Sequence, residues 1–476
     1  MADTVTTPAT TGSNGGRAPL NNTRVAVVGG GFSGVMAARE LTEKGMQVTV
    51  YEARHRLGGR VFTDRQIIPG KTVEAGAELI GENHKLWFQL AKQFGLTLIP
   101  LTTEDEYEAA GLAVRLRLGT TDLSAADKAR LHKELAPVLA RIGREAKPIN
   151  PLTPWTSKNA AALDKRSIAD RFADADMFGK KKSFARSFLE LIIANDQVAP
   201  LEHQSWLGLL TLVSAGRMGD DEAGMNGYWT HTETHRCLHG NDQLATKLAQ
   251  QLRDVRLGTE VVEIRIEANE VLVHQGHGVA RCIDHYDYVV LSTPPTVWPR
   301  IHATPAFDPG RFSMAHGPAH KYLTAFDTEF WKARKLAPSA LWDRLGSVWE
   351  STDGQPAATA GFGLSIFAGG PFTGDATHYK TQLANLYADY PQLVRSERMV
   401  NWTADPFSLT GYVIPSPGQV TSIGPNLTKP FNGRLFFAGE QCSPGFFGYM
   451  EGALQAGQLA AQRVATAAAA SPAHTP

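Results

Sequence analysis

The chain has few cysteines, no long apolar run and no excess of either charge. Its three cysteines, Cys237, Cys282 and Cys442, form no CxxC pair, which is typical of a protein in a reducing compartment. No stretch of about 18 apolar residues is present, so no membrane-spanning helix is expected. The 47 basic residues balance the 47 acidic ones, which argues against a nucleic-acid partner. We therefore predict a soluble, cytoplasmic protein that binds neither nucleic acid nor membranes.

Both ends of the chain lack the composition of a packed core. Residues 1–22 are rich in Thr, Gly and Ser and have no apolar segment of the kind found in signal peptides, so we predict a disordered leader. Residues 467–476 are rich in alanine and finish in Ser, Pro and His, and they are predicted to be a disordered tail. Between these ends, the chain has enough apolar residues for more than one domain, because 43% of the 476 residues are hydrophobic.

The most informative segment covers residues 24–60. An apolar run, residues 25–28, meets the glycine-rich sequence GGGFSG, and an amphipathic stretch then leads to a second apolar run, residues 47–51. A strand, a glycine turn, a helix and a parallel strand that ends in a carboxylate form the unit that binds the ADP part of a dinucleotide. Glu52 is that carboxylate, 18 residues after Gly34, and we expect it to accept the ribose hydroxyl groups.

Each glycine of this unit has a physical task. Gly29 permits the tight turn, Gly31 lets the backbone approach a pyrophosphate, and Gly34 lets the helix pack closely on the strand. The free N–H groups at the helix start, with Phe32 and Ser33, then face the phosphate charge. A plain glycine loop is the alternative, but the position between two apolar strands favours a nucleotide site.

The residues that follow Glu52 separate a flavin from a nicotinamide cofactor. Residues 54–61, RHRLGGRV, form a basic segment broken by glycines. With the dinucleotide unit, this segment resembles the flavin-containing amine oxidase family, which includes monoamine oxidases, polyamine oxidases and L-amino acid oxidases. The resemblance implies that Arg60 pairs with the FAD pyrophosphate. Considered alone, the three arginines of the segment could also form an ordinary solvated turn.

A second motif lies near the end of the chain. Residues 433–440, GRLFFAGE, predict a buried strand that stops at Gly439-Glu440, and residues 448–457 predict the start of a helix. In the family, the acid after this strand bonds the ribityl chain and the helix start faces the flavin N1 edge, which implies these roles for Glu440 and Met450. The resemblance implies the following cofactor-binding residues: Gly29, Gly31, Phe32, Ser33, Gly34, Glu52, Ala53, Arg54, Gly58, Gly59, Arg60, Ala77, Glu78, Val262, Thr293, Trp402, Gly439, Glu440, Gly448, Tyr449 and Met450.

The flavin is expected to be held without a covalent bond. Family members with a covalent flavin carry a cysteine directly before a tyrosine of the aromatic cage. Here Gly411 precedes the matching Tyr412. Cys442 stands at a different place in the motif and is expected to be a buried thiol.

Four residues are the candidates for catalysis. Lys321 matches the family lysine that holds a water molecule against flavin N5, where a positive charge favours reoxidation by O2. Tyr412 and Tyr449 match the aromatic walls that guide a neutral amine to the flavin, and Trp402 is expected to flank the flavin near Lys321. A solvated strand lysine and ordinary core aromatics are the alternatives for these positions.

The substrate is less well specified. An amino acid needs a cation for its carboxylate, best an arginine, but Leu79 stands where animal L-amino acid oxidases of the family carry that arginine. Residues 233–244 resemble the bacterial L-amino acid oxidase branch, so Arg217 or Arg236 could supply the cation and Glu78 would favour a polar or cationic side chain. The predicted substrate-binding residues are Glu78, Arg217, Arg236, Trp229, Tyr412, Gly448 and Tyr449. We favour L-amino acids by a small margin over primary amines and polyamines.

The predicted reaction is an oxidative deamination. A hydride passes from the substrate to flavin N5, the resulting imine is hydrolysed to a 2-oxo acid and ammonia, and O2 is reduced to H2O2. The partners are thus a small amino acid or amine and O2, and a homodimer is compatible with the sequence but not specified by it. Residues 231–239, HTETHRCLH, alternate metal-capable side chains, but their spacing fits no standard zinc pattern and we expect a polar strand face without a metal.

We predict a mixed α/β fold in which domains are threaded through one another. A Rossmann-like FAD-binding domain of the GR2, or p-hydroxybenzoate hydroxylase, type is expected from residues 23–80, 232–320 and 425–466. A mixed-sheet substrate domain is expected from residues 81–100 and 321–424. Residues 101–231 are expected to form a helical subdomain at the substrate entry, with helical periodicity over residues 166–213.

Overall fold

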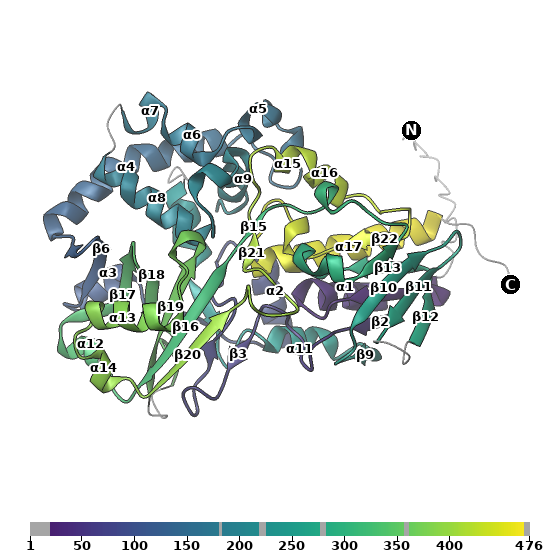
Figure 1. The fold of residues 1–476 in the computed structure, drawn as a ribbon, viewed down its shortest axis with the longest axis horizontal. Helices are drawn as coiled ribbons and strands as arrows, with labels where there is room; N and C mark the ends of the chain where they lie inside the picture. The colour runs from purple at the N-terminus through teal and green to yellow at the C-terminus, as the bar shows by residue number, and fades with distance from the viewer. Residues whose placement is uncertain (1–19, 180–182, 219–224, 277–281, 357–360, 471–476) are drawn as a thin grey trace, which may run out of the picture.

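The computed structural model describes residues 20–179, 183–218, 225–276, 282–356 and 361–470. Figure 1 shows a parallel sheet with its helices at the right, a second large sheet at the lower left and a group of helices above that sheet. The expected mixed α/β architecture is confirmed. Within the described residues, no helix is both long and apolar enough to cross a bilayer.

A five-stranded parallel sheet joins segments from the beginning, middle and end of the chain. Its order is β22 (Leu435–Phe437), β13 (Tyr288–Leu291), β1 (Arg24–Val28), β2 (Gln47–Tyr51) and β9 (Asp254–Arg256). The central strands are apolar along their whole length, and residues 25–28 of β1 are all buried. Such continuous apolar runs are what a parallel sheet covered on both faces requires.

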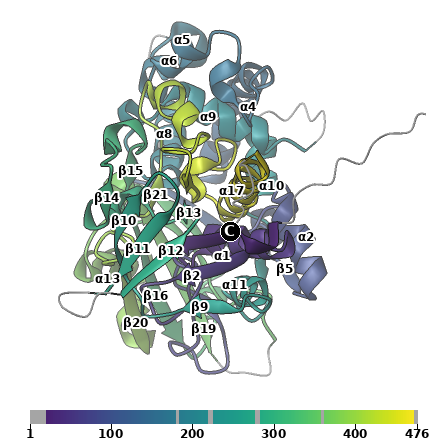
Figure 2. The same cartoon turned by 90° about the vertical axis from the view of Figure 1, so that its right-hand side faces the viewer.

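Helices α1 (Phe32–Glu43) and α17 (Met450–Ala470) pack against each other on one face of this sheet (Figure 2). Two glycines make the close approach necessary. A Cβ atom at Gly34 would lie 1.9 Å from the carbonyl oxygen of Gly29, and one at Gly457 would lie 2.3 Å from that of Ser33. The first contact sets the helix on β1 and the second sets α17 on α1.

A four-stranded sheet shares a core with the opposite face of the parallel sheet. Its order is β12 (Cys282–Tyr286), β11 (Val271–Gln275), β10 (Val261–Ile266) and β14 (His302–Thr304). Ile264 and Val273 from this sheet pack with Ala26 and Leu291 from the parallel sheet. The result is three layers, with helices on one side and a smaller sheet on the other.

The second large sheet has seven strands. Their order is β20 (Ser396–Asn401), β16 (Ala319–Phe326), β19 (Phe362–Gly369), β18 (Gly346–Glu350), β17 (Leu336–Trp342), β6 (Ala113–Leu118) and β7 (Thr121–Asp122). All neighbours are antiparallel except β17 and β6. Every residue of β16 is buried. One face of this sheet is covered by α12 (Phe330–Ala333), α13 (Ala376–Leu386) and α14 (Tyr390–Leu393).

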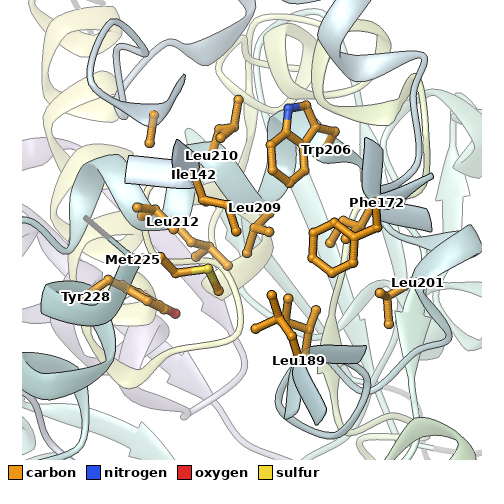
Figure 3. Close-up of a cluster of buried hydrophobic side chains, with 14 of the residues drawn as sticks. Ile142, Phe172, Leu189, Leu201, Trp206, Leu209, Leu210, Leu212, Met225 and Tyr228 are labelled. Atoms are coloured by element: carbon orange, nitrogen blue, oxygen red, sulfur yellow. The ribbon is translucent and has the colours of Figure 1, made fainter. Parts of the chain in front are cut away.

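The helices above this sheet enclose a separate apolar core. They are α4 (Ala125–Ala146), α5 (Ala160–Asp164), α6 (Ile168–Phe172), α7 (Ala175–Phe178), α8 (Phe184–Asp196), α9 (Trp206–Ala215) and α10 (Met225–Thr232). Figure 3 shows Phe172, Leu189, Trp206 and Tyr228 gathered in this core. Tyr412 and Tyr449 pack against the same cluster, so the helical core also positions the expected aromatic walls.

The remaining elements are short connections and covers. Their bounds are α2 (Lys85–Phe94), α3 (Glu104–Ala109), α11 (Gln243–Ala249), α15 (Gln419–Ser422), α16 (Gly424–Leu427), β3 (Thr63–Asp64), β4 (Val73–Glu74), β5 (Leu98–Pro100), β8 (His235–Cys237), β15 (His316–Gly317) and β21 (Tyr412–Val413).

The structure differs from the sequence-based expectation within residues 101–231 and at both ends. Within residues 166–213, where helical character was predicted, Ser167, Ser183 and Ser205 each cap the start of a helix with a side-chain oxygen. Strands β6 and β7 lie within the range expected to be helical and join the seven-stranded sheet. The sequence of β6, AVRLRL, explains its strand conformation, because apolar and charged residues alternate over residues 114–118 with the period of a strand.

The ends also differ. Leu20–Asn22 forms a single 3-10 turn within the predicted leader, and α17 continues to Ala470, into the predicted tail. Alanine has the highest helix propensity of all residues, which explains the longer helix. The rest of both predicted segments, residues 1–19 and 471–476, lies outside the described residues.

The helix contact at Gly457 yields a stability prediction. Alanine at this position should lower the free energy of unfolding by about 1–3 kcal/mol, because the added methyl group forces α17 away from α1. The matched control is Gly208→Ala in α9, where a Cβ atom would meet its nearest neighbour at 3.5 Å. Denaturant unfolding of both variants measures the difference. Equal stabilities would contradict the close packing of α1 on α17.

Candidate active site

A cavity of about 360 Å³ extends between the parallel sheet and the seven-stranded sheet. At one end it is lined by residues at the carboxyl ends of β1 and β2, such as Gly29 and Glu52. At the other it is lined by residues of the seven-stranded sheet, such as Lys321 and Phe367. Ligands of open α/β folds bind beyond the carboxyl ends of the parallel strands, and this volume is in the range of cofactor and substrate pockets.

The glycine turn after β1 forms the nucleotide end of the cavity. Gly29 has φ of +107°, a conformation that favours glycine. Helix α1 begins without a side-chain cap, and both Gly31 and Phe32 line the cavity, so its first N–H groups are available to an anion. A Cβ atom at Gly59 would lie 3.2 Å from the Cα atom of Gly31. Two glycine loops thus make a cradle with backbone walls, which fits a pyrophosphate.

Glu52 is fixed at the edge of this cradle. Its carboxylate accepts hydrogen bonds from the backbone N–H of Gly30 at 2.7 Å and of Arg54 at 2.8 Å. Arg54 in turn bonds Ser408 at 3.0 Å and pairs with Asp405. A buried carboxylate held in this way suits the ribose hydroxyl groups of an adenine dinucleotide.

Arg60 and Glu440 lie together in the middle of the cavity wall. Arg60 Nη1 donates to Glu440 Oε1 at 3.0 Å and to the carbonyl oxygen of Gly411 at 2.8 Å. The other Glu440 oxygen accepts the N–H of Gly448 at 2.8 Å. This salt bridge joins the GGR segment to the carboxyl-terminal motif and brings both predicted cofactor contacts to one place.

Lys321 comes from β16 and points into a buried ionic cluster. Its Nζ donates to the carbonyl oxygen of Glu74 at 3.0 Å and to the carboxylate of Glu78. The Nζ also lies 5.1 Å from the centre of the Trp349 ring. Across the sheet, Lys321 pairs with Phe367 of β19, which pairs with Ser347 of β18. All three side chains line the cavity, so the strand register places them in one row.

Glu78 is held by two cations. Its Oε2 binds Lys321, whereas Oε1 accepts from Trp349 Nε1 at 3.0 Å and lies 3.2 Å from Arg236 Nη2. The side chains of Glu78, Arg236 and Lys321 are only 2%, 4% and 6% exposed. Burial raises the pKa of Glu78, but the charges of Lys321 and Arg236 more than offset this effect and hold its pKa below the usual value.

The two predicted aromatic walls are fixed through their hydroxyl groups. Tyr412 donates to the carbonyl oxygen of Asp196 at 2.5 Å, and Tyr449 shares a hydrogen bond with Tyr228. A Cβ atom at Gly448 would lie 3.0 Å from the Tyr412 ring, so a glycine keeps the space beside this ring open. Burial raises the pKa of both Tyr412 and Tyr449 well above the usual range, so both rings remain neutral.

Trp402 lies on the same wall of the cavity. Its indole Nε1 donates to the carbonyl oxygen of Ala75 at 3.1 Å. The side chain is buried and lines the cavity. Its position is fixed from outside the cavity, which leaves the ring face for a ligand.

Asp196 and Glu233 contribute two further carboxyl groups to the cavity wall. Within the described residues, neither side chain has a hydrogen-bond or ion-pair partner. Glu233 is exposed, but the surrounding protein atoms partly desolvate its carboxyl group and, with the nearby charge of Glu78, raise its pKa to about 7. Burial and the charge of Glu233 raise the pKa of Asp196 well above its usual value.

Most of the predicted residues lie together. Those that line the cavity are Gly29, Gly31, Phe32, Ser33, Glu52, Ala53, Arg54, Gly58, Gly59, Arg60, Ala77, Glu78, Thr293, Lys321, Trp402, Tyr412, Gly439, Glu440, Gly448, Tyr449 and Met450. Five predicted residues do not line it: Gly34, Arg217, Trp229, Arg236 and Val262.

Four of the five exceptions have local reasons, and nothing in the structure explains why Arg217 does not line the cavity. Gly34 is packed against Gly29, and Val261 lines the cavity in place of Val262 because neighbouring residues of a strand point to opposite faces. Arg236 is directed to Glu78 and to the carbonyl oxygens of Glu350 and Asp353, at 3.0 and 3.2 Å. Trp229 packs against the helical core instead.

Sequence reasoning did not single out several residues of the cavity wall. The main ones are Asp196, Gln197, Glu233, Ser347, Trp349, Phe367 and Phe447. Glu233 belongs to the alternating segment 231–239 and to the segment 233–244 that resembles the bacterial branch, but neither pattern assigns it a role of its own. The alternating segment is no single strand, because α10 ends at Thr232 and β8 begins at His235. Across the described ranges, no group of three His, Cys, Asp or Glu side chains could hold a metal ion.

Comparisons with known proteins agree with this geometry. The chain is 26% identical over 472 residues to the flavin-containing amine oxidase of Oncorhynchus mykiss, covering 93% of this chain and 86% of that protein. It is 24% identical over 455 residues to a probable flavin-containing monoamine oxidase A of Dictyostelium discoideum, covering 91% and 95%.

Solved structures of two oxidases share the fold. Cyclohexylamine oxidase from Brevibacterium oxydans superposes with a TM-score of 0.77 at 22% identity and covers 94% of this chain and 98% of its own. A putrescine oxidase bound to putrescine also gives a TM-score of 0.77, at 20% identity, and covers 93% and 99%.

The family model of flavin containing amine oxidoreductases matches residues 32–465. The match begins within the first glycine motif, covers the whole of the second, and confirms the sequence-based resemblance. The chain therefore belongs to the flavin-containing amine oxidoreductase family and is an FAD-dependent enzyme that oxidises amines.

Proposed function

We propose that the protein is an oxidase of primary amines that carry a second cationic group, such as a diamine or polyamine, with an aldehyde, ammonia and H2O2 as products. The observation that carries this proposal is the pair of carboxyl groups without a partner, Asp196 and Glu233, in the cavity wall. Asp196 is half-buried and Glu233 is exposed, and both line the cavity. A carboxylate in a cavity wall that no protein cation compensates attracts a cation. A substrate ammonium group is the cation that could enter the cavity.

The local backbone adds to this negative potential. Asp196 is the last residue of α8 and Glu233 directly follows α10. Helix carboxyl ends carry partial negative charge, so a cation is favoured near both of them. The two carboxyl groups and the two helix ends therefore all favour the binding of a positively charged group.

The charges disfavour an α-carboxylate. Three arginines line the cavity, and they are engaged with acceptors at its nucleotide end: Arg54 with Asp405, Arg60 with Glu440 and Arg300 with the carbonyl oxygen of Pro406. Arg236, one of the two arginines considered for the substrate carboxylate, binds Glu78 instead. An amino-acid carboxylate would also meet Asp196 and Glu233. These observations favour the amine alternative over the L-amino acid preference drawn from the sequence.

The names of the related proteins point the same way. One relative is described as a monoamine oxidase, and the two structural neighbours are oxidases of putrescine and cyclohexylamine. None of these names refers to an amino acid. Their substrates support an amine substrate for this chain as part of the proposal.

The residues of the cavity suit this chemistry. When bound, FAD accepts a hydride from the carbon next to the amine nitrogen and passes the electron pair to O2, which yields H2O2. Tyr412 and Tyr449 provide neutral walls for the neutral reacting amine. Asp196 and Glu233 hold the second ammonium group and so orient the chain of the substrate. Lys321 provides a fixed positive charge, and water hydrolyses the imine product to the aldehyde and ammonia.

We also propose that FAD is held without a covalent bond. Cys442 is buried but does not line the cavity, and the residue before Tyr412 is a glycine. Acid precipitation of the purified protein should therefore release all the yellow chromophore into the supernatant. A precipitate that keeps the absorbance near 450 nm would contradict this assignment.

The acidic pair can be tested by isosteric substitution. Asp196→Asn and Glu233→Gln should each raise KM for 1,4-diaminobutane about tenfold or more, because one charge contact to the second ammonium is lost. KM for butylamine, which has the same length but one amine, should change less than about twofold. Steady-state H2O2 release with both substrates measures the effect.

The control for charge loss is Glu82→Gln. Glu82 is exposed, pairs with His231 and does not line the cavity, so KM for both amines should remain unchanged. The cation site would be refuted if the Asp196 and Glu233 variants affected both amines equally. Absence of H2O2 with every amine tested would refute the oxidase proposal itself.

The raised pKa of Glu233 gives a pH prediction. Below its pKa of about 7 this carboxyl is neutral, and above that value it is charged, whereas an alkyl ammonium, with an ordinary pKa of about 10.4, stays charged throughout. The ratio of kcat/KM for 1,4-diaminobutane to that for butylamine should thus rise about tenfold between pH 6 and 8. Glu233→Gln should flatten the rise, and an equally steep rise in that variant would show that another group is responsible.

A further inference from the structure

We propose that Arg236 is a positioning residue for Lys321, which acts through Glu78 to fix the lysine ammonium and to leave a net positive charge at the flavin end of the cavity. This inference rests on the role given to Lys321 in the proposed function. It is independent of which amine is the substrate. Neither Arg236 nor its partners at the carbonyl groups of residues 350 and 353 has to touch the flavin or the substrate.

The contacts of Arg236 are those of a structural clamp. Its Nη2 donates to the carbonyl oxygen of Glu350 at 3.0 Å and lies 3.2 Å from Glu78 Oε1, while Nη1 donates to the carbonyl oxygen of Asp353 at 3.2 Å. Arg236 belongs to β8, whereas Glu350 is the last residue of β18 in the seven-stranded sheet and Asp353 follows that strand. The guanidinium therefore joins two parts of the fold at the point where Glu78 must be held.

Glu78 links Arg236 to Lys321. Its two oxygens face different partners, Oε1 toward Arg236 and Trp349 and Oε2 toward Lys321. Because Arg236 and Trp349 fix Oε1, the plane of the carboxylate is fixed and Oε2 has a single place for the ammonium. Lys321 is held from its other side by the carbonyl oxygen of Glu74 at 3.0 Å.

The charges of the cluster explain why a second cation is needed. Lys321 and Glu78 alone would form a neutral pair, in which the carboxylate cancels most of the field of the ammonium. With Arg236, the three buried side chains carry a net charge of about +1. Glu74 adds little negative charge at neutral pH because burial raises its pKa to about 8. The positive field at this end of the cavity thus depends on Arg236 as much as on Lys321.

An arginine suits the position better than a lysine would. The planar guanidinium reaches three acceptors in fixed directions, whereas an ammonium group holds its contacts less rigidly. Arg236→Lys should keep the charge but only part of the geometry, and Arg236→Gln should remove the charge while keeping one donor. These two variants separate charge from packing.

The test uses the FAD-bound enzyme and does not require an amine substrate. The flavin is reduced with dithionite in the absence of oxygen, excess reductant is removed, and the protein is mixed with O2 at pH 6, where Glu74 and Glu233 are mostly protonated. Arg236→Gln should slow reoxidation at least about tenfold, because a unit charge near the reacting centre is lost. Its flavin midpoint potential should also be lower than that of the unaltered protein. Arg236→Lys should lie closer to the unaltered protein in both measurements.

The matched control is Arg171→Gln. Arg171 is equally buried and pairs with Glu145, Asp174 and Asp176, but it lies in α6 and does not line the cavity. The Arg171→Gln variant should be less stable than the unaltered protein but should have the same rate of flavin reoxidation and the same flavin midpoint potential. If Arg236→Gln does not retain FAD, Arg236→Met is measured as the second neutral variant and Arg236→Lys still reports on geometry.

Two results would overturn the inference. One is a neutral variant of Arg236 that binds FAD and shows an unchanged reoxidation rate and potential. The other is a lysine variant as slow as the neutral one, which would exclude a role for the charge. A failure of the proposed function looks different, because the unaltered protein would then oxidise no amine while the rates of reoxidation could still be compared.

Discussion

The buried ionic cluster of Lys321, Glu78 and Arg236 determines how the rest of the cavity can be used. Ionised groups removed from water are costly unless they are paired and hydrogen-bonded, and Glu78 satisfies this condition with two cations and an indole N–H. Glu78 is therefore not available to a substrate. Asp196 and Glu233 have no such partners within the described residues. The contrast between a compensated and an uncompensated carboxyl group is the basis of the proposed preference for cationic substrates.

The fold brings this cluster to the cofactor end through close backbone contacts. Gly34 and Gly457 allow β1, α1 and α17 to pack without side chains between them, which sets the glycine cradle next to the start of α17. The fully buried strand β16 carries Lys321 to the opposite wall. Arg60 and Glu440, 380 residues apart, form the salt bridge that joins the GGR segment to the carboxyl-terminal motif. The site thus depends on contacts between segments that are distant in sequence.

Much of the nucleotide end could be predicted from the sequence, because glycine positions there are dictated by backbone geometry. The turn at Gly29, the close approach at Gly31 and the carboxylate at Glu52 have local patterns that do not depend on the rest of the fold. The family resemblance added Lys321, Tyr412 and Tyr449, which the structure brings to the same cavity. Their catalytic roles remain part of the proposal.

The charge pattern of the substrate end could not be predicted in the same way. Arg236 was expected to bind a carboxylate because of its residue type, but the nearest carboxylate is Glu78 of the protein itself. Asp196 carries no local signal, since its importance comes from the position of the end of α8. Glu233 lies in a segment whose alternating side chains resemble a metal-binding pattern, so its place in the cavity wall could not be predicted from that pattern. In each case the partner of the side chain, and not its type, decides its function, and partners are set by tertiary packing.

The most direct test of the account is the anaerobic reduction of the bound flavin by four substrates of similar length: 1,4-diaminobutane, butylamine, 4-aminobutanoate and L-ornithine. The decay of absorbance near 450 nm gives a rate for each substrate in the same holoenzyme. We expect the largest second-order rate constant of flavin reduction for 1,4-diaminobutane, a smaller one for butylamine and the smallest for 4-aminobutanoate. The last compound would place its carboxylate against Asp196 and Glu233. Faster reduction by L-ornithine than by the diamine would contradict the account, because an α-carboxylate would then be recognised in a cavity that has no free cation assigned to it.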